Sequence, residues 1–162
     1  MVLTIDIGNT TIGIGGFQGN KLLFIEKISS RRPLSDAGYI EKLNMILNKH
    51  GLSAEAFEGS MISSVVPSVT AVFSSALETF LGRKPLILSH KLDLGYEICT
   101  EFPEKVGCDR LADIAGAISR YSLPFVTIDL GTATTFNVLD ENRRFLGGLI
   151  LPGVGTAHRA LL

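Results

Sequence analysis

Two short stretches of this sequence carry the same combination of residue types. In Asp6–Gly13, a strand-like apolar run ends in Asp-x-Gly and is followed by Asn, Thr and Thr. In Asp129–Thr135, the same Asp-x-Gly is followed by three Thr and one Ala. A carboxylate at a strand end can hold a cation or its waters, and glycine lets the backbone approach an anion closely. Hydroxyl and amide groups add donors for phosphate oxygens, so two such turns could bind one polyphosphate from two sides.

Either stretch alone is also compatible with an ordinary hairpin, because Gly-Asn is common turn chemistry. The repetition favours the phosphate site, since turns do not require an acidic residue at the same strand end twice. The sequence holds no Gly-Lys-Ser or Gly-Lys-Thr, so this is not a Walker-type loop.

A third candidate is the tetrapeptide Gly107-Cys108-Asp109-Arg110. Asp109 stands where a helix N-cap belongs, ahead of an apolar helical pattern. It could instead be a general base beside Arg110, whose guanidinium can hold a carboxylate or phosphate bidentately. Phosphoryl transfer to an alcohol needs such a carboxylate to accept the hydroxyl proton. Cys108 is read as a small packed residue, because no His lies near it in sequence.

The elements that must position these residues follow from periodicity and turn signals. Helices are expected from Asp36 to about Gly51, from a cap at Ser68 to Gly82, and over 109–121. Residues 89–106 are expected to be irregular. Strands are expected at 2–7, 11–17, 21–28, 61–66, 85–88 (buried), 125–130, 132–139 and 144–149.

This order is a three-strand meander, then helices alternating with strands, then a second meander. It predicts a duplicated α/β fold with a first lobe at 1–124 and the start of a second at 125–162. The second copy is expected to be incomplete here, because a full lobe would need roughly as many residues again as 29–124.

Composition narrows the class of protein. Hydrophobic residues make up 46% and charged residues 19% of the 162, which is typical of a globular domain. The net charge of −1 argues against a nucleic-acid partner, which needs a basic face. The two cysteines show neither metal spacing nor a disulfide framework, which fits a reducing cytoplasm. We expect no membrane segment, since no apolar run is long enough to span a bilayer.

Five sequence motifs together resemble the type III pantothenate kinase family, which includes the Bvg accessory factor type. In their order along the sequence, the motifs span almost the whole chain. They are Asp6-Ile7-Gly8-Asn9-Thr10, Ser63-Ser64-Val65-Val66-Pro67, Gly107-Cys108-Asp109-Arg110, Asp129-Leu130-Gly131-Thr132-Ala133-Thr134-Thr135 and Gly147-Gly148-Leu149-Ile150-Leu151-Pro152-Gly153.

The resemblance implies an actin-like, ribonuclease H-like fold and ATP-dependent phosphorylation of pantothenate, the first step toward coenzyme A, in a cytoplasmic homodimer. It implies Mg²⁺ and a monovalent cation, K⁺ or NH₄⁺, bound by Asp129, with Asp6 as a further metal ligand. Gly107, Cys108, Asp109 and Arg110 would hold pantothenate, with Asp109 as proton acceptor and Arg110 offsetting charge. The ATP phosphates would lie against Asp6, Ile7, Gly8, Asn9, Thr10, Thr11, Ile12, Gly13, Gly131 and Thr132.

Some features depart from the family pattern. Thr100 stands where many members have a Tyr that touches substrate, and Glu101-Phe102-Pro103 replaces the usual Asp-Asn-Pro. Family members also run well past Leu162. Two alternatives therefore stay open: a kinase for another small hydroxy or carboxylate substrate, such as a sugar or acetate, and a non-catalytic nucleotide-binding regulator of the same fold.

Overall fold

The computed structural model describes residues 1–161. They form two compact units, Met1–Leu88 and a second one that begins at Ser89. The expected boundary between 124 and 125 falls inside the second unit, because the helix before it packs on the strands that follow it. Within residues 1–161, no helix combines the length and the apolar character needed to cross a bilayer.

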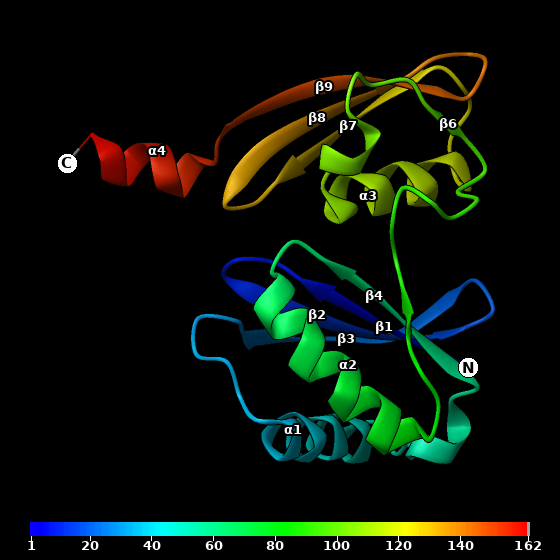
Figure 1. Cartoon of the computed structure of the whole chain (residues 1–162), viewed down its shortest axis with the longest axis vertical. Coiled ribbons are helices and arrows are strands. Elements are labelled where there is room, and N and C mark those ends of the chain that lie inside the picture. The colour runs from blue at the N-terminus through cyan, green and yellow to red at the C-terminus, as the bar shows by residue number, and fades with distance from the viewer. Residues whose placement is uncertain (162) are drawn as a thin grey trace. The chain divides into compact units, whose positions relative to one another are not determined.

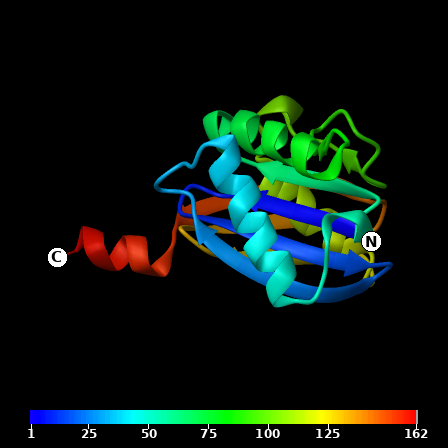
Figure 2. The same cartoon turned by 90° about the horizontal axis from the view of Figure 1, so that it is seen from below.

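The first unit is a five-stranded sheet of order β3-β2-β1-β4-β5 with two helices (Figures 1 and 2). β1, β2 and β3 form an antiparallel meander, and β4 and β5 extend it in parallel on the other side of β1. The elements are β1 Val2–Ile7, β2 Thr11–Gln18, β3 Lys21–Ser29, α1 Asp36–Lys49, a 3₁₀ turn at Ala54–Ala56, β4 Gly59–Ser64, α2 Pro67–Leu81 and β5 Leu86–Ile87.

Both helices of this unit have recognisable boundaries. The Ser35 hydroxyl accepts a hydrogen bond from the Gly38 N–H and caps α1. α2 ends at Gly82, which takes the left-handed conformation that glycine allows (φ 66°). The expected cap at Ser68 is wrong, because the helix already begins at Pro67 and the residue before it has no side-chain cap. Proline suits this first position because it has no N–H to satisfy.

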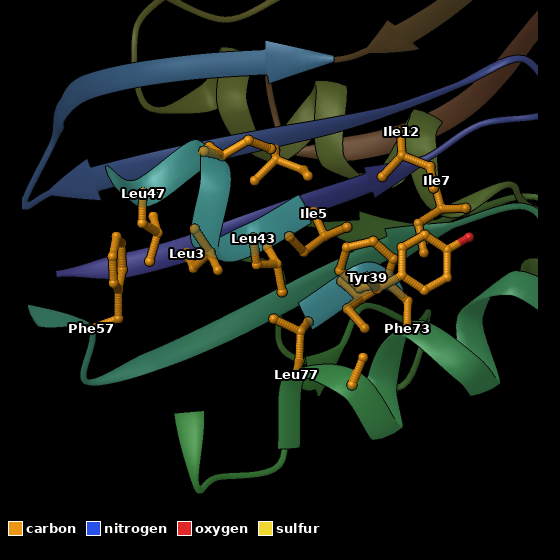
Figure 3. Packing of buried hydrophobic residues seen from close by; sticks show 14 of the residues in the cluster. Leu3, Ile5, Ile7, Ile12, Tyr39, Leu43, Leu47, Phe57, Phe73 and Leu77 are labelled. Carbon is orange, nitrogen blue, oxygen red and sulfur yellow. The ribbon is translucent and has the colours of Figure 1, made fainter. Parts of the chain in front are cut away.

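The core of the first unit lies between the sheet and the two helices (Figures 2 and 3). Alternate residues of β1 point into it, so that Leu3, Ile5 and Ile7 are at most 1% exposed. From the helices, Tyr39 and Phe73 meet with ring centroids 4.5 Å apart. The expected buried strand at 85–88 is only partly so: its Leu88 is buried, but Leu86 and Ile87 are about half exposed because β5 is an edge strand.

The second unit repeats the meander in a four-stranded sheet of order β6-β9-β8-β7 (Figure 1). This confirms the duplicated α/β pattern expected from the sequence. β6 lies in the stretch expected to be irregular and pairs in parallel with β9. The elements are β6 Glu97–Ile98, a 3₁₀ turn at Pro103–Lys105, α3 Cys108–Ile118, β7 Phe125–Leu130, β8 Ala133–Leu139, β9 Arg144–Pro152 and α4 Val154–Ala160.

Candidate functional site

The first predicted phosphate turn joins β1 to β2. Asp6 is paired with Gly13 on β2 and with Ser63 on β4, and its side chain is exposed. The Gly8 N–H donates to the Thr11 carbonyl at 3.0 Å and closes the turn. The two strands therefore present a carboxylate beside a glycine that adds no side chain to the surface.

The side chains within this turn divide into two sets. Ile7 and Ile12 are fully buried in the core, so they can meet a phosphate only through their backbone. Asn9 and Thr11 are exposed, and Thr10 is half-buried. The polar side chains are thus on the accessible side of the turn, as phosphate contacts require.

The second predicted phosphate turn joins β7 to β8 in the same way. Asp129 is paired with Thr135, and the Gly131 N–H donates to the Ala133 carbonyl at 2.9 Å. A Cβ on Gly131 would lie 3.5 Å from Asp129 Oδ2, so the carboxylate lies beside the glycine of the turn. Both turns therefore join antiparallel strands and are closed by the N–H of the Asp-x-Gly glycine, and the second turn is one residue shorter than the first.

The start of α4 supports this second turn, which the sequence did not reveal. The Gly153 N–H and the Thr156 hydroxyl both donate to the Thr132 carbonyl, at 3.1 and 2.9 Å. A Cβ on Gly153 would overlap the Gly131 carbonyl oxygen and lie 2.7 Å from that of Thr132. Pro152-Gly153 indicated only the end of a strand, whereas its glycine also allows this close approach.

The strongly apolar residues 125–128 predict a poorly solvated Asp129 carboxylate that needs a cation as its partner, and this prediction of burial is wrong. Asp129 is exposed in the structure. The apolar residues before it do not ensure burial, because β7 is the edge strand of its sheet and Val126 and Ile128 are themselves 53% and 56% exposed.

Two buried hydroxyls, one beside each carboxylate, are additional oxygen ligands that a cation could use. Ser63 and Thr135 are buried, and neither hydroxyl has a hydrogen-bond partner among residues 1–161. Each is the cross-strand neighbour of Asp6 or Asp129 and lies on the same face of its sheet. No group of three or more His, Cys, Asp or Glu in the described chain could hold a metal alone. Mg²⁺ commonly takes one or two carboxylates plus substrate phosphates, so each carboxylate with its neighbouring hydroxyl offers oxygen ligands of the kind that Mg²⁺ takes.

The Gly107–Arg110 motif forms the first turn of α3. The helix N-cap is Gly107, without a side-chain cap, and Asp109 is the second helical residue. The interpretation of Asp109 as the cap is therefore wrong. Its Oδ1 instead accepts a hydrogen bond from the Arg110 N–H at 2.8 Å, and the side chain is half-buried. Leu111 and Ile114 anchor the helix and are fully buried.

Arg110 lies against the sheet of the same unit. Its Nε donates to Asn137 Oδ1 at 2.6 Å, and its Nη2 donates to the Phe136 carbonyl at 3.1 Å. The guanidinium carbon lies 5.5 Å from the centre of the Phe145 ring. Burial lowers the pKa of Arg110, while the nearby Asp109 and Asp113 carboxylates raise it. A fixed cation thus lies beside the carboxylate of Asp109.

A hollow of about 510 Å³ lies on the flank of the second unit between α3 and β7. Asp113 and Arg120 line it from the helix side, and Thr127 and Asp129 line it from the strand. Asp109 and Arg110 do not line it. The structure therefore brings Arg110 onto β8 and Asp129 to the edge of this hollow, while the Asp6 turn belongs to the other unit.

The sequence profile of the type III pantothenate kinase family matches residues 2–162. The chain belongs to this family. Among proteins with that name, those of Bifidobacterium animalis subsp. lactis and Thermomicrobium roseum are 39% and 37% identical to it, over 99% of this chain. The matches cover 64% and 62% of those proteins, so the chain spans a little under two thirds of their length.

Solved structures show the fold alone, because their sequence identity is low. A reductive activator for a corrinoid, iron–sulfur protein matches with a TM-score of 0.52 and 13% identity, over 86% of this chain and 29% of that one. The ethanolamine utilization protein EutJ of Carboxydothermus hydrogenoformans matches with a TM-score of 0.51 and 14% identity, over 96% and 53%. The fold is that of the actin-like ATPases, as the sequence indicated.

Proposed function

We propose that the complete gene product containing this chain transfers the γ-phosphoryl group of ATP to pantothenate, which gives 4′-phosphopantothenate for coenzyme A synthesis. The observation that carries the proposal is membership of the type III pantothenate kinase family over residues 2–162. The paired Asp-x-Gly turns and the half-buried carboxylate of Asp109 beside Arg110 support it.

The two turns supply the groups for ATP. Their backbone N–H groups, together with the hydroxyls of Thr10, Thr11 and Thr132, would bind phosphate oxygens. Asp6 and Asp129 would hold Mg²⁺ and the monovalent cation, or their waters. Magnesium, when bound, offsets the negative charge of the phosphates. The turn residues can then orient the γ-phosphoryl group toward the attacking hydroxyl.

The first turn of α3 supplies the acceptor chemistry. Gly107–Arg110 would contact pantothenate, and Asp109 would accept the proton of its terminal hydroxyl as that oxygen attacks phosphorus in line. Arg110 would stabilise negative charge on the substrate or on the transferring group. We further propose that the protein is cytoplasmic, where its product 4′-phosphopantothenate is a soluble metabolite. We also propose that it is a homodimer, as the family resemblance implies.

The test uses the complete gene product with ATP and Mg²⁺. Pantothenate, acetate and glucose are supplied separately in potassium or sodium buffer, and ADP release and product mass are measured. We expect a product one phosphoryl group heavier from pantothenate alone, formed faster in potassium. A phosphorylated product from acetate or glucose alone would indicate another substrate class. ATP binding without transfer to any of them would favour a regulatory protein, and equal rates in both buffers would contradict the cation role.

A further inference from the structure

Asn137 on β8 is a fully buried amide with both ends engaged. Its Nδ2 donates to Thr127 Oγ1 on β7 at 2.9 Å, and its Oδ1 accepts from Arg110 Nε on α3 at 2.6 Å. A buried amide is costly unless its donors and acceptors are paired, so this arrangement holds only while the three side chains keep their places. Asn137 therefore links the meander to the first turn of α3.

The surroundings leave the guanidinium little freedom. Nη2 of Arg110 also donates to the Phe136 carbonyl at 3.1 Å. Gly148 of β9 pairs with Asn137, and a Cβ there would overlap the Phe136 oxygen and lie 2.9 Å from Arg110 Nη2. The lack of a side chain at Gly148 thus leaves room for the Arg110 guanidinium beside β8.

Asp109 is the neighbour of this fixed arginine. The backbone N–H of Arg110 donates to Asp109 Oδ1 at 2.8 Å, so the Asp109 carboxylate is held by the backbone of the residue whose side chain Asn137 fixes. We propose that Asn137 is a positioning residue for phosphoryl transfer: it holds Arg110, and through it Asp109, where the acceptor hydroxyl must lie. This inference rests on the proposed function.

A purely structural role for Asn137 would predict loss of stability without a specific effect on rate. The two roles separate in Asn137→Ala and Asn137→Asp. Alanine removes the acceptor for Arg110 Nε, whereas a carboxylate accepts from both Arg110 and the Thr127 hydroxyl and so retains the link. Tyr96→Phe is the matched control, because the Tyr96 hydroxyl donates to the Leu111 carbonyl of the same helix at 3.0 Å.

The experiment measures each variant of the complete gene product in two ways. The first is solvent exchange of the Arg110 Nε–H in ¹⁵N NMR spectra, assigned by its absence in Arg110→Lys. The second is kcat/KM for pantothenate, measured on protein shown to be folded. We expect slow exchange in wild type, Asn137→Asp and Tyr96→Phe, with near-normal kcat/KM. We expect fast exchange in Asn137→Ala, and a fall in kcat/KM of about 10- to 100-fold, as a misplacement near 1 Å can cause.

Normal kcat/KM in folded Asn137→Ala would overturn the proposal, as would an equal loss in Tyr96→Phe. If Asn137→Ala does not fold, Thr127→Val removes the other partner of the amide and must show the same pair of effects in milder form. A wild-type protein that transfers no phosphoryl group refutes the proposed function instead. The exchange of the Arg110 Nε–H then still decides whether Asn137 holds the arginine.

Discussion

Gly153→Ala should distort the second phosphate turn, because the added methyl group would press on the backbone carbonyls of that turn. Gly153 lies at the start of α4, where its N–H donates to the Thr132 carbonyl. A Cβ at this position would lie 2.7 Å from the Thr132 carbonyl oxygen and would overlap that of Gly131. Both carbonyls belong to the turn proposed to bind ATP, so the substitution acts on that turn without changing any group in it.

The size of the effect follows from these contacts. An ordinary Cβ contact begins at 3.4 Å, so the Thr132 carbonyl must retreat by about 0.7 Å and that of Gly131 by more. Backbone carbonyls cannot rotate away as a flexible side chain does. Forcing an extra methyl group into a packed site typically costs about 1–3 kcal/mol. A displacement approaching 1 Å in a group that orients a substrate can lower the rate by about 100-fold.

The assay compares urea unfolding and ATP-analogue affinity in the complete gene product. Gly155→Ala is the control, because a Cβ there would only touch Arg159 at 3.7 Å and alanine favours a helix. We expect Gly153→Ala to unfold at lower urea and to bind the analogue more weakly, with Gly155→Ala unchanged or stabilised. Wild-type stability and affinity in Gly153→Ala would refute the packing described for this turn.

Three further predictions concern other parts of the molecule. The Tyr39 hydroxyl is buried and has no partner among residues 1–161, so Tyr39→Phe should raise the free energy of unfolding by about 1 kcal/mol in urea titrations; a loss would show that the hydroxyl is satisfied. Hydrogen bonds from Lys49 and then His50 lower the pKa of Glu26 from 4.5, so its contribution to stability is present above about pH 4.5 and is lost as the pH falls below that value. The urea midpoints of wild type and Glu26→Gln should therefore differ most near neutral pH and converge in acid, and a constant difference would contradict this. Asp129→Ala should raise the KM for ATP more than that for pantothenate in steady-state kinetics, and equal changes would argue against its role in the nucleotide site.

Local signals predicted most of the fold. The apolar residues before Asp6 indicated a buried first strand at 2–7, and the structure buries every second residue of that strand. Gly82 indicated the end of α2, because few other residues take the left-handed conformation found there. The repeated meander was visible for the same reason, since each hairpin carries its own turn signal within a few residues.

Apart from the two helix caps expected at Ser68 and Asp109, the errors concern features that depend on residues distant in sequence. β6 was missed because a two-residue strand has no periodicity and exists only through its pairing with β9. The exposure of Asp129 depends on which edge of the sheet β7 occupies, and its own sequence does not contain that information. Asn137 was missed because its partners Thr127 and Arg110 are 10 and 27 residues away in sequence.

Asp109→Asn distinguishes a base for phosphoryl transfer to pantothenate from a carboxylate that only belongs to the first turn of α3. Gly107, not Asp109, is the cap of α3, so the substitution should change the free energy of unfolding by less than about 1 kcal/mol. The measurement is the rate of 4′-phosphopantothenate formation by mass spectrometry, in wild-type and Asp109→Asn gene products with matched unfolding midpoints. If Asp109 is the base, the variant should lose about 10²- to 10⁴-fold in rate. Turnover near that of wild type would contradict that role.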